Sequence, residues 1–80
     1  MFYTYILRSE SSAKHYYGHT QDLEERLLRH NENRERATKS RGPWKSIYFE
    51  EFSTRSEAMK REKFFKTYAG WKWLKEQSII

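Results

Sequence analysis

Apolar and aromatic residues at the start of the chain follow the pattern of extended strands. Residues 2–7 are aromatic, β-branched or apolar, and they predict a strand. Both of its faces carry apolar side chains, because Ile6 lies on one face and Leu7 on the other. We therefore expect this strand to be covered on both sides. Residues 9–14 are small and polar and predict a turn, and residues 15–19 predict a second strand that completes a hairpin.

The pattern then changes to the spacing of a helix. This helix is predicted to begin at a cap formed by Thr20 or Asp22 and to end near Asn31, since Asp22 opens a capping-box sequence. Leu23 and Leu27 form its apolar stripe. We expect this stripe to pack on the strands before it.

A loop, a third strand and two helices are predicted for the second half of the chain. Residues 32–43 are charged and predict a loop, and residues 44–52 predict the third strand. A helix is predicted over about residues 55–68, broken by Gly70, with a last short helix over residues 71–77.

The resulting order, β-β-α-β-α-α, predicts an α+β fold. Its sheet is a three-stranded antiparallel one flanked by helices. With 80 residues, the chain is predicted to form a single domain over residues 1–80.

Composition excludes several classes of function. The chain has no Cys, which rules out disulfide scaffolds, thiolate zinc sites and thiol nucleophiles. It lacks the glycine-rich loops that hold nucleotide phosphates and the nucleophile elbow of serine hydrolases. No apolar run approaches the ~20 residues of a membrane span, and no signal peptide is recognisable at the start. A cytoplasmic protein with no membrane partner is therefore expected.

The charge balance favours an anionic partner. Sixteen Lys and Arg residues against eleven Asp and Glu residues give a net charge of +5. A basic domain of this kind often binds nucleic acid, although a basic surface without that role is the alternative.

Two polar residues interrupt the apolar side of the first helix. At about 100° per residue, His30 lies about 20° from Leu23 and Arg26 about 60° from it on the same side. Arg26 and His30 are neighbours at positions i and i+4. A cation on this side needs an anion, a ligand or the solvent edge. The simpler interpretation is an Arg that reaches a surface carboxylate and a hydrogen-bonded core His.

The second long helix repeats this feature. Glu57 and Arg61 lie inside an apolar arc that includes Ala58 and Phe65. Glu57 stands where a capping-box Glu belongs, three residues after Thr54, and it has the spacing of an ion pair with Arg61. A carboxylate facing the sheet could instead bind Mg²⁺, which accepts one protein carboxylate together with several waters.

Four segments together resemble the GIY-YIG nuclease superfamily, and in particular its small single-domain bacterial branch. They are Tyr3-Thr4-Tyr5-Ile6-Leu7, Tyr16-Tyr17-Gly18-His19-Thr20, Asp22-Leu23-Glu24-Glu25-Arg26-Leu27 with His30, and Thr54-Arg55-Ser56-Glu57-Ala58. The chain departs from the family pattern at Tyr3 and Thr4, where the first motif has Gly and Ile, and at His19, where some relatives have Lys. The resemblance implies a three-stranded antiparallel sheet with helices and Mg²⁺-dependent hydrolysis of phosphodiester bonds in DNA, as in DNA repair or processing.

The resemblance also implies roles for five residues. Tyr5 and Tyr16 match the tyrosines of the two family motifs, Arg26 matches the family Arg, and His30 matches a position that holds His or Tyr. Glu57 matches the metal-binding Glu. Tyr16, Tyr5 or His30 would orient or deprotonate the attacking water, and the sequence does not choose among them.

Basic side chains outside this set are candidates for contacts with the DNA backbone. They are His19, Arg34, Arg36, Lys39, Arg41, Lys60, Lys63 and Lys66. Two other functions stay open: a nucleic-acid-binding module that does not cleave, and a protein-interaction domain that uses its tryptophans.

Overall fold

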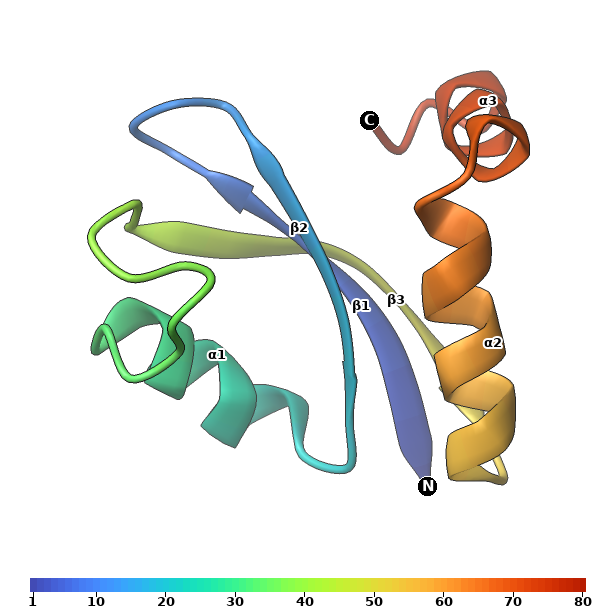
Figure 1. Ribbon diagram of the computed structural model, residues 1–80, viewed down its shortest axis with the longest axis horizontal. Helices are drawn as coiled ribbons and strands as arrows, with labels where there is room; N and C mark the ends of the chain where they lie inside the picture. The colour runs from blue at the N-terminus through green and yellow to red at the C-terminus, as the bar shows by residue number, and fades with distance from the viewer.

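The computed structural model describes residues 1–80 and has three strands and three helices (Figure 1). In chain order these are β1 (Phe2–Ser9), β2 (His15–Thr20), α1 (Leu23–Asn31), β3 (Trp44–Phe52), α2 (Arg55–Phe65) and α3 (Tyr68–Glu76). The sheet has the order β2-β1-β3, and both pairs of strands are antiparallel. The predicted α+β class and sheet are confirmed. None of the helices is long and apolar enough to cross a membrane.

The central strand is apolar on both faces because helices cover both. Figure 1 shows the sheet between α1 on the left and α2 with α3 on the right. On the α1 face, Leu7 packs with Trp44 and Leu27. On the other face, Ile6 packs with Phe65 and other side chains of α2 and α3. The expectation that β1 is covered on both sides is therefore confirmed.

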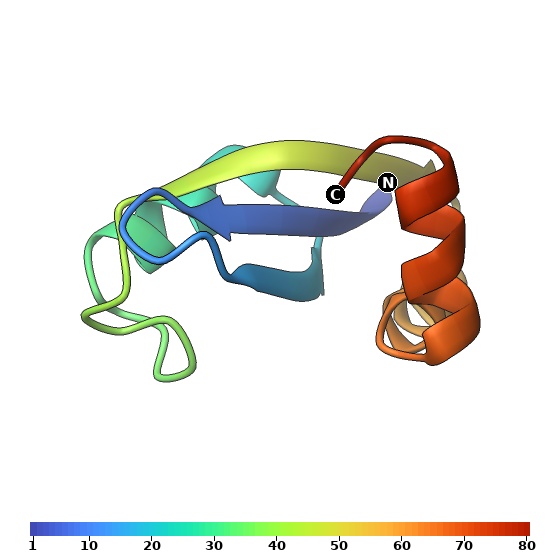
Figure 2. The ribbon, with the colours of Figure 1, turned by 90° about the horizontal axis from the view of Figure 1, so that it is seen from above.

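Two segments project beyond β2 on the same side of the molecule. Figure 2 shows the loop between α1 and β3, in green, at one end of the sheet and α2 with α3 at the other. The strand between these two projections is β2, an edge strand. The backbone edge of β2 therefore lies between a loop and a helix that both carry basic residues.

Side-chain caps fix where the first two helices begin. The Asp22 carboxylate accepts the backbone N–H of Glu25 at 3.1 Å, so the cap of α1 is Asp22 and not Thr20. At α2, the Thr54 hydroxyl accepts the Glu57 N–H at 3.2 Å, and the Glu57 carboxylate accepts the Thr54 N–H at 3.2 Å. The capping box predicted at Thr54 and Glu57 forms completely, whereas at Asp22 only the cap bond forms, because the Asp22 N–H bonds to the Thr20 hydroxyl and not to Glu25. These bonds satisfy backbone donors that a helix start otherwise leaves free.

The junction of α2 and α3 differs from the prediction. The break was expected at Gly70, but α2 ends at Phe65, and Gly70 lies in the first turn of α3. Thr67 begins α3, because its hydroxyl accepts the backbone N–H of Gly70 at 3.1 Å. Gly70 is required for a different reason: a Cβ there would lie 1.9 Å from the carbonyl oxygen of Phe64.

Replacing Gly70 by Ala should therefore destabilise the protein. In an unconstrained helix interior the same change stabilises by about 1 kcal/mol, because Gly is a poor helix former. Here the clash with the Phe64 backbone should reverse the sign and cost about 1–3 kcal/mol. Denaturant unfolding of Gly70→Ala and of the exposed control Lys72→Ala tests this. Equal or higher stability of Gly70→Ala would contradict the close approach.

Candidate active site

Four of the predicted site residues come together on the α1 side of the sheet. Tyr5 lies on β1 and Tyr16 on β2, and both pack in the cluster beneath α1. The His30 ring lies 5.9 Å from the Tyr5 ring and 4.8 Å from the Tyr16 ring, centre to centre. Arg26 lies one helical turn before His30 on α1 and acts on the pKa values of both tyrosines. The pattern that placed Arg26 and His30 on the inward side of the helix is thus confirmed.

A chain of hydrogen bonds fixes Tyr5 and His30. The Tyr5 hydroxyl lies 2.9 Å from His30 Nε2, and His30 Nδ1 lies 2.7 Å from the Thr38 hydroxyl. Thr38 can donate its own proton to the Glu35 carbonyl oxygen at 3.4 Å. The consistent assignment therefore has His30 Nδ1–H donating to Thr38 and the Tyr5 O–H donating to Nε2. His30 is fully buried, so in this geometry it holds the Tyr5 hydroxyl and does not face solvent.

Burial keeps both partners of this bond neutral. It lowers the pKa of His30, which Arg26 and Arg29 lower further while Glu35 opposes them. It also raises the pKa of the Tyr5 hydroxyl far above its ordinary value. A neutral imidazole and a neutral phenol are the states that the hydrogen bond requires.

Gly18 makes room for the Tyr5 phenol. The two residues face each other across β1 and β2. A Cβ on Gly18 would lie 2.5 Å from the Tyr5 hydroxyl oxygen and 3.0 Å from the Tyr16 ring. The Tyr5 ring can therefore fold over the strand toward α1 only because position 18 has no side chain.

Tyr16 is the tyrosine with a free hydroxyl. Its ring packs against His30 and Trp44, but its oxygen takes part in no hydrogen bond within the protein. Burial raises the pKa of the phenol, and the Glu62 carboxylate raises it further, whereas Lys66 and Arg26 lower it. Tyr16 can thus offer its hydroxyl to a bound molecule, while Tyr5 cannot.

One N–H group of Arg26 has no hydrogen-bond acceptor. Its Nε is buried and makes no hydrogen bond. The nearest carboxylate oxygen, Glu35 Oε1, is 3.6 Å away, and the other oxygen of Glu35 accepts from Arg29 at 3.1 Å. Arg26 does reach a carboxylate, as the simpler interpretation expected, but at an ion-pair distance that leaves its N–H unsatisfied. Such a donor suits an anionic ligand.

A second acidic residue near this group is Glu62 of α2, which raises the pKa of Tyr16. Its carboxylate is 2.6 Å from His19 Nδ1 and 2.7 Å from Lys66 Nζ. Burial alone raises the pKa of Glu62, but the hydrogen bonds from Lys66 and His19 outweigh burial and lower it. Only 18% of the side chain is exposed. Glu62 is therefore an ionised carboxylate on the β2 side of α2, within electrostatic reach of Tyr16.

Glu57, the predicted metal ligand, lies on the other flank of α2. Viewed down the helix axis, with about 100° between successive residues, Glu62 lies about 40° to one side of the buried Ala58. Glu57 lies about 100° to the other side of it. Arg61, which shares the flank of Glu57, is bonded to Glu50 of β3 at 2.7 Å. The Glu57 carboxylate is exposed and bonded to Thr54. This geometry does not favour a role for Glu57 beside Tyr16 and Arg26, and the helical spacing itself would have favoured Glu62.

Comparison with known proteins identifies the family of the chain. Residues 1–70 match the family described as the GIY-YIG catalytic domain. The chain belongs to the GIY-YIG family. A UPF0213 protein of Staphylococcus saprophyticus is 39% identical over 74 residues, covering 91% of this chain and 89% of that protein. A UPF0213 protein of Listeria welshimeri is 44% identical over 63 residues, covering 78% and 69%.

A solved structure supports the fold of this GIY-YIG domain. The solution NMR structure of a UPF0213 protein from Bacillus halodurans has 27% sequence identity and a TM-score of 0.56. The similarity covers 96% of this chain and 85% of that one. The expected kinship with small bacterial proteins is confirmed.

The family implies a divalent metal ion, and Glu62 fits it better than Glu57 does. No three His, Asp or Glu side chains gather closely enough to form a metal cage. An ionised carboxylate at an open edge is nevertheless the donor that Mg²⁺ takes when waters and substrate oxygens complete its shell. Glu62 meets this description because its lowered pKa keeps it charged.

The residues predicted to contact DNA lie on β2, on the loop after α1 and on α2, where Lys60 shares a pocket with Glu57, and not all of them are free. His19 and Lys66 are bonded to Glu62, and Arg34 is paired with Glu32 at 3.0 Å. The others are exposed and make no ion pair: Arg36, Lys39 and Arg41 on the loop, and Lys60 and Lys63 on α2.

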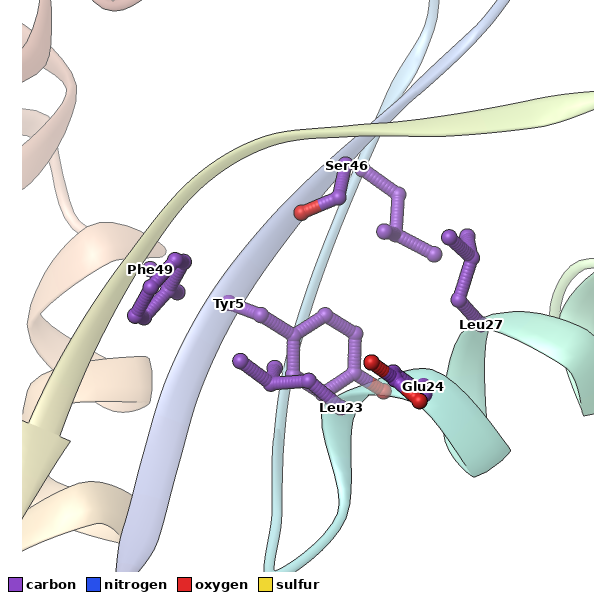
Figure 3. Close-up of a pocket in the computed structure, with 7 residues that line it drawn as sticks. Tyr5, Leu23, Glu24, Leu27, Ser46 and Phe49 are labelled. Atoms are coloured by element: carbon purple, nitrogen blue, oxygen red, sulfur yellow. The ribbon is translucent and has the colours of Figure 1, made fainter.

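The apolar cavity of about 220 Å³ between α1 and β3 is a different feature (Figure 3). Its walls include Tyr5, Leu23, Leu27 and Phe49, and its charged rim residue is Glu24. Figure 3 shows the Tyr5 ring with Phe49 of β3 on one side and Leu27 of α1 on the other. Because the lining contains no cation, the cavity does not suit a phosphate group.

The neutral state of His30 should make stability depend on pH. Because folding lowers its pKa below the ordinary value of 6.5, the unfolded chain takes up a proton first. Stability should be full above pH 6.5 and should decline as the pH falls from there through the folded-state pKa. Urea unfolding between pH 7.5 and about 5 measures this. His30→Gln should flatten the slope. His15→Gln should flatten it less, because folding also lowers the pKa of His15 but leaves its side chain more exposed than that of His30. An unchanged slope in His30→Gln would contradict the neutral assignment.

Proposed function

We propose that this domain is a metal-dependent endonuclease that hydrolyses phosphodiester bonds in DNA, as part of DNA repair or processing. The proposal rests on one observation: Tyr16, Arg26 and Glu62 lie around the edge of β2, where the Tyr16 hydroxyl and Arg26 Nε make no hydrogen bond within the protein and Glu62 is ionised. Together they supply a hydroxyl, a cationic N–H donor and an ionised carboxylate. These are the groups that phosphodiester hydrolysis needs to position a water and to hold negative charge.

Arg26 would bind the phosphate that is attacked. Its guanidinium is planar and can donate two parallel hydrogen bonds to phosphate oxygens. The unpartnered Nε provides the driving force, because a phosphate oxygen would satisfy a donor that is now buried without an acceptor. Glu35 keeps the guanidinium near the site without consuming this donor.

Tyr16 would orient the attacking water and accept its proton. His30 and Tyr5, the other candidates for the base, already use their polar atoms on each other and on Thr38. The pKa of Tyr16 is raised by burial, so its phenol needs nearby positive charge to lose its proton. A metal ion held by Glu62 would supply such charge and would stabilise the phosphate and the leaving oxygen.

Basic residues on both sides of β2 would hold the DNA. Arg36, Lys39 and Arg41 stand on the loop side, Lys60 and Lys63 on the α2 side, and each is exposed. Lys66 and His19 would position the Glu62 carboxylate and contact the phosphate next to it. Contacts of this kind release counterions, so binding should weaken steeply as salt rises.

Two matched variants test which acidic residue, Glu62 or Glu57, is needed for cleavage. Glu62→Gln should reduce cleavage of labelled DNA in Mg²⁺ by at least about a hundredfold. Glu57→Gln should cleave like the wild type, because Gln also serves at the third position of a capping box. Cleavage should disappear in EDTA for all three proteins.

Three results would contradict the proposal. Loss of activity in Glu57→Gln alone would return the metal site to the position predicted from the sequence. Salt-sensitive binding with no cleavage on duplex, branched or single-stranded DNA would favour a binding module. Flat salt dependence with no cleavage would favour a protein-interaction domain.

Replacing Tyr16 should affect cleavage, whereas replacing Tyr5 should affect stability. Tyr16→Phe should lower cleavage by about 10²–10⁴-fold and change stability by less than about 0.5 kcal/mol, since its hydroxyl makes no internal bond. Tyr5→Phe should cost about 1–3 kcal/mol of stability, because it leaves His30 Nε2 buried without a donor. Cleavage rates and urea unfolding of the two variants test this. The assignment fails if Tyr16→Phe cleaves normally.

A further inference from the structure

A second group of basic residues lies at the other end of β2, on the face that α2 and α3 cover. Arg8 of β1 stands opposite His15 of β2 and also opposite Lys45 of β3. Cross-strand partners share a face of the sheet, so these three side chains stand in a row. Lys75 of α3 approaches the same row, since it lines one cavity with Arg8 and His15.

These basic side chains form no ion pair with Asp or Glu. None of the four comes within 4.0 Å of an Asp or Glu carboxylate oxygen, whereas Arg61 and Lys66 each have an acidic partner. Partial burial and the charges of Arg8 and Lys75 together lower the pKa of His15. Like charges directly opposite each other destabilise a sheet, so the fold tolerates a cost here that an external anion would relieve.

The row borders a cavity that could receive such an anion. Arg8, His15 and Lys75 line a hollow of about 320 Å³ with an apolar floor that includes Ile47 and Ile79. Figure 1 shows the C-terminal residues, in red, turning back from α3 toward the sheet. Basic groups around one concave surface suit the charge of a phosphate group, and the cavity is large enough to hold one.

Two exposed aromatic rings adjoin this cavity through Lys75. Tyr68 is 75% exposed and Trp71 is 45% exposed. Their rings are stacked, with centres 5.8 Å apart, and Lys75 Nζ lies 5.7 Å from the centre of the Trp71 ring. Exposed aromatic rings beside lysines form the kind of surface on which unpaired bases stack.

We propose that the start of β2 and the exposed side of α3 form a subsite for a single nucleic-acid strand. A backbone phosphate occupies the cavity lined by Arg8, His15 and Lys75, and an unpaired base stacks on Trp71. The identity of the ligand rests on the proposed function. Unpaired cations favour a phosphate backbone over a peptide, whose own backbone is uncharged.

The subsite lies close enough to the candidate active site to hold the same strand. His15 and His19 are on one face of β2 and four residues apart, which is about 13 Å along an extended strand. His19 is bonded to Glu62. A few unpaired nucleotides would span this distance, so the subsite would favour substrates that have a single-stranded segment beside the cleaved bond.

Binding measured in EDTA tests the subsite without any contribution from cleavage. The probe is a fluorescent oligothymidylate of about 12 nucleotides, compared with a duplex of the same length. Trp71→Ala should weaken binding of the single strand by about tenfold, and Lys75→Gln by about two- to fivefold. Lys72→Gln is the matched control: it removes an exposed charge of α3 that does not line the cavity, and it should change affinity less than twofold.

A second readout is specific to the cavity. The imidazole resonances of His15, followed by NMR during a pH titration, should report a higher pKa when the oligothymidylate is bound, because a phosphate next to it offsets Arg8 and Lys75.

The proposal is overturned if Trp71→Ala and Lys75→Gln bind the single strand like the wild type. It is also overturned if Lys72→Gln weakens binding as much as they do, which would indicate diffuse electrostatic attraction. Duplex binding that is equally sensitive to Trp71→Ala would exclude stacking of unpaired bases. Failure of the nuclease proposal would appear separately, as an absence of cleavage in Mg²⁺.

Discussion

The hydrogen bond between the Tyr5 hydroxyl and His30 Nε2 joins the sheet to the first helix, and the rest of the candidate site depends on it. It requires a glycine opposite Tyr5, because any side chain at position 18 would occupy the space of the phenol. It also requires the loop after α1, which brings Thr38 to the other nitrogen of His30. One bond thus fixes the distance between the β2 edge and α1, and with it the place of Arg26.

Further hydrogen bonds fix the loop after α1 and so help to hold Thr38 beside His30. The Asn31 side chain bonds to both backbone groups of Trp44, at 2.6 and 3.1 Å, so the two ends of the loop are fixed to each other. The Trp44 indole N–H donates to the Thr38 carbonyl oxygen at 3.2 Å. Thr38 is therefore held from two directions. The exposed basic residues on the same loop gain a rigid base from which to contact a ligand.

Most of the fold could be predicted because its elements carry local signals. The strands show strong β-forming residues, and the capping sequences at Asp22 and Thr54 begin helices where they were expected. The end of α2 could not be predicted in the same way. It depends on Thr67 acting as a cap and on the close approach of Gly70 to Phe64, and that approach exists only once α3 is folded back.

Part of the candidate site could also be predicted from the sequence. Resemblance to the family pointed to Tyr5, Tyr16, Arg26 and His30, and the helical spacing supported the last two. Glu62 was not singled out from the sequence because the capping box drew attention to Glu57, whose carboxylate is bonded to the Thr54 backbone and hydroxyl. Tyr16 could not be preferred over Tyr5 from sequence, since the difference lies in which hydroxyl finds a partner in the folded chain.

Whether a cationic side chain has an acidic partner, more than where it lies on its helix, decides whether it is available to a ligand. Arg61 lies inside the apolar side of α2, as Arg26 lies beside that of α1. Arg61, however, makes two hydrogen bonds to Glu50, at 2.7 and 3.1 Å, and its guanidinium lies within 5 Å of three aromatic ring centres. Such a guanidinium is satisfied, and we expect it to stabilise the fold alone.

Arg26 and the row at Arg8 have no comparable partners. A protein with eleven acidic residues could supply them, yet Glu35 bonds to Arg29 and Glu50 to Arg61. Arg26 Nε therefore keeps an unsatisfied N–H on one side of β2, and Arg8 faces Lys45 without an acidic partner beside the start of that strand. A donor without an acceptor and like charges that face each other both cost folding stability, and a polyanionic strand lying along β2 would recover part of this cost.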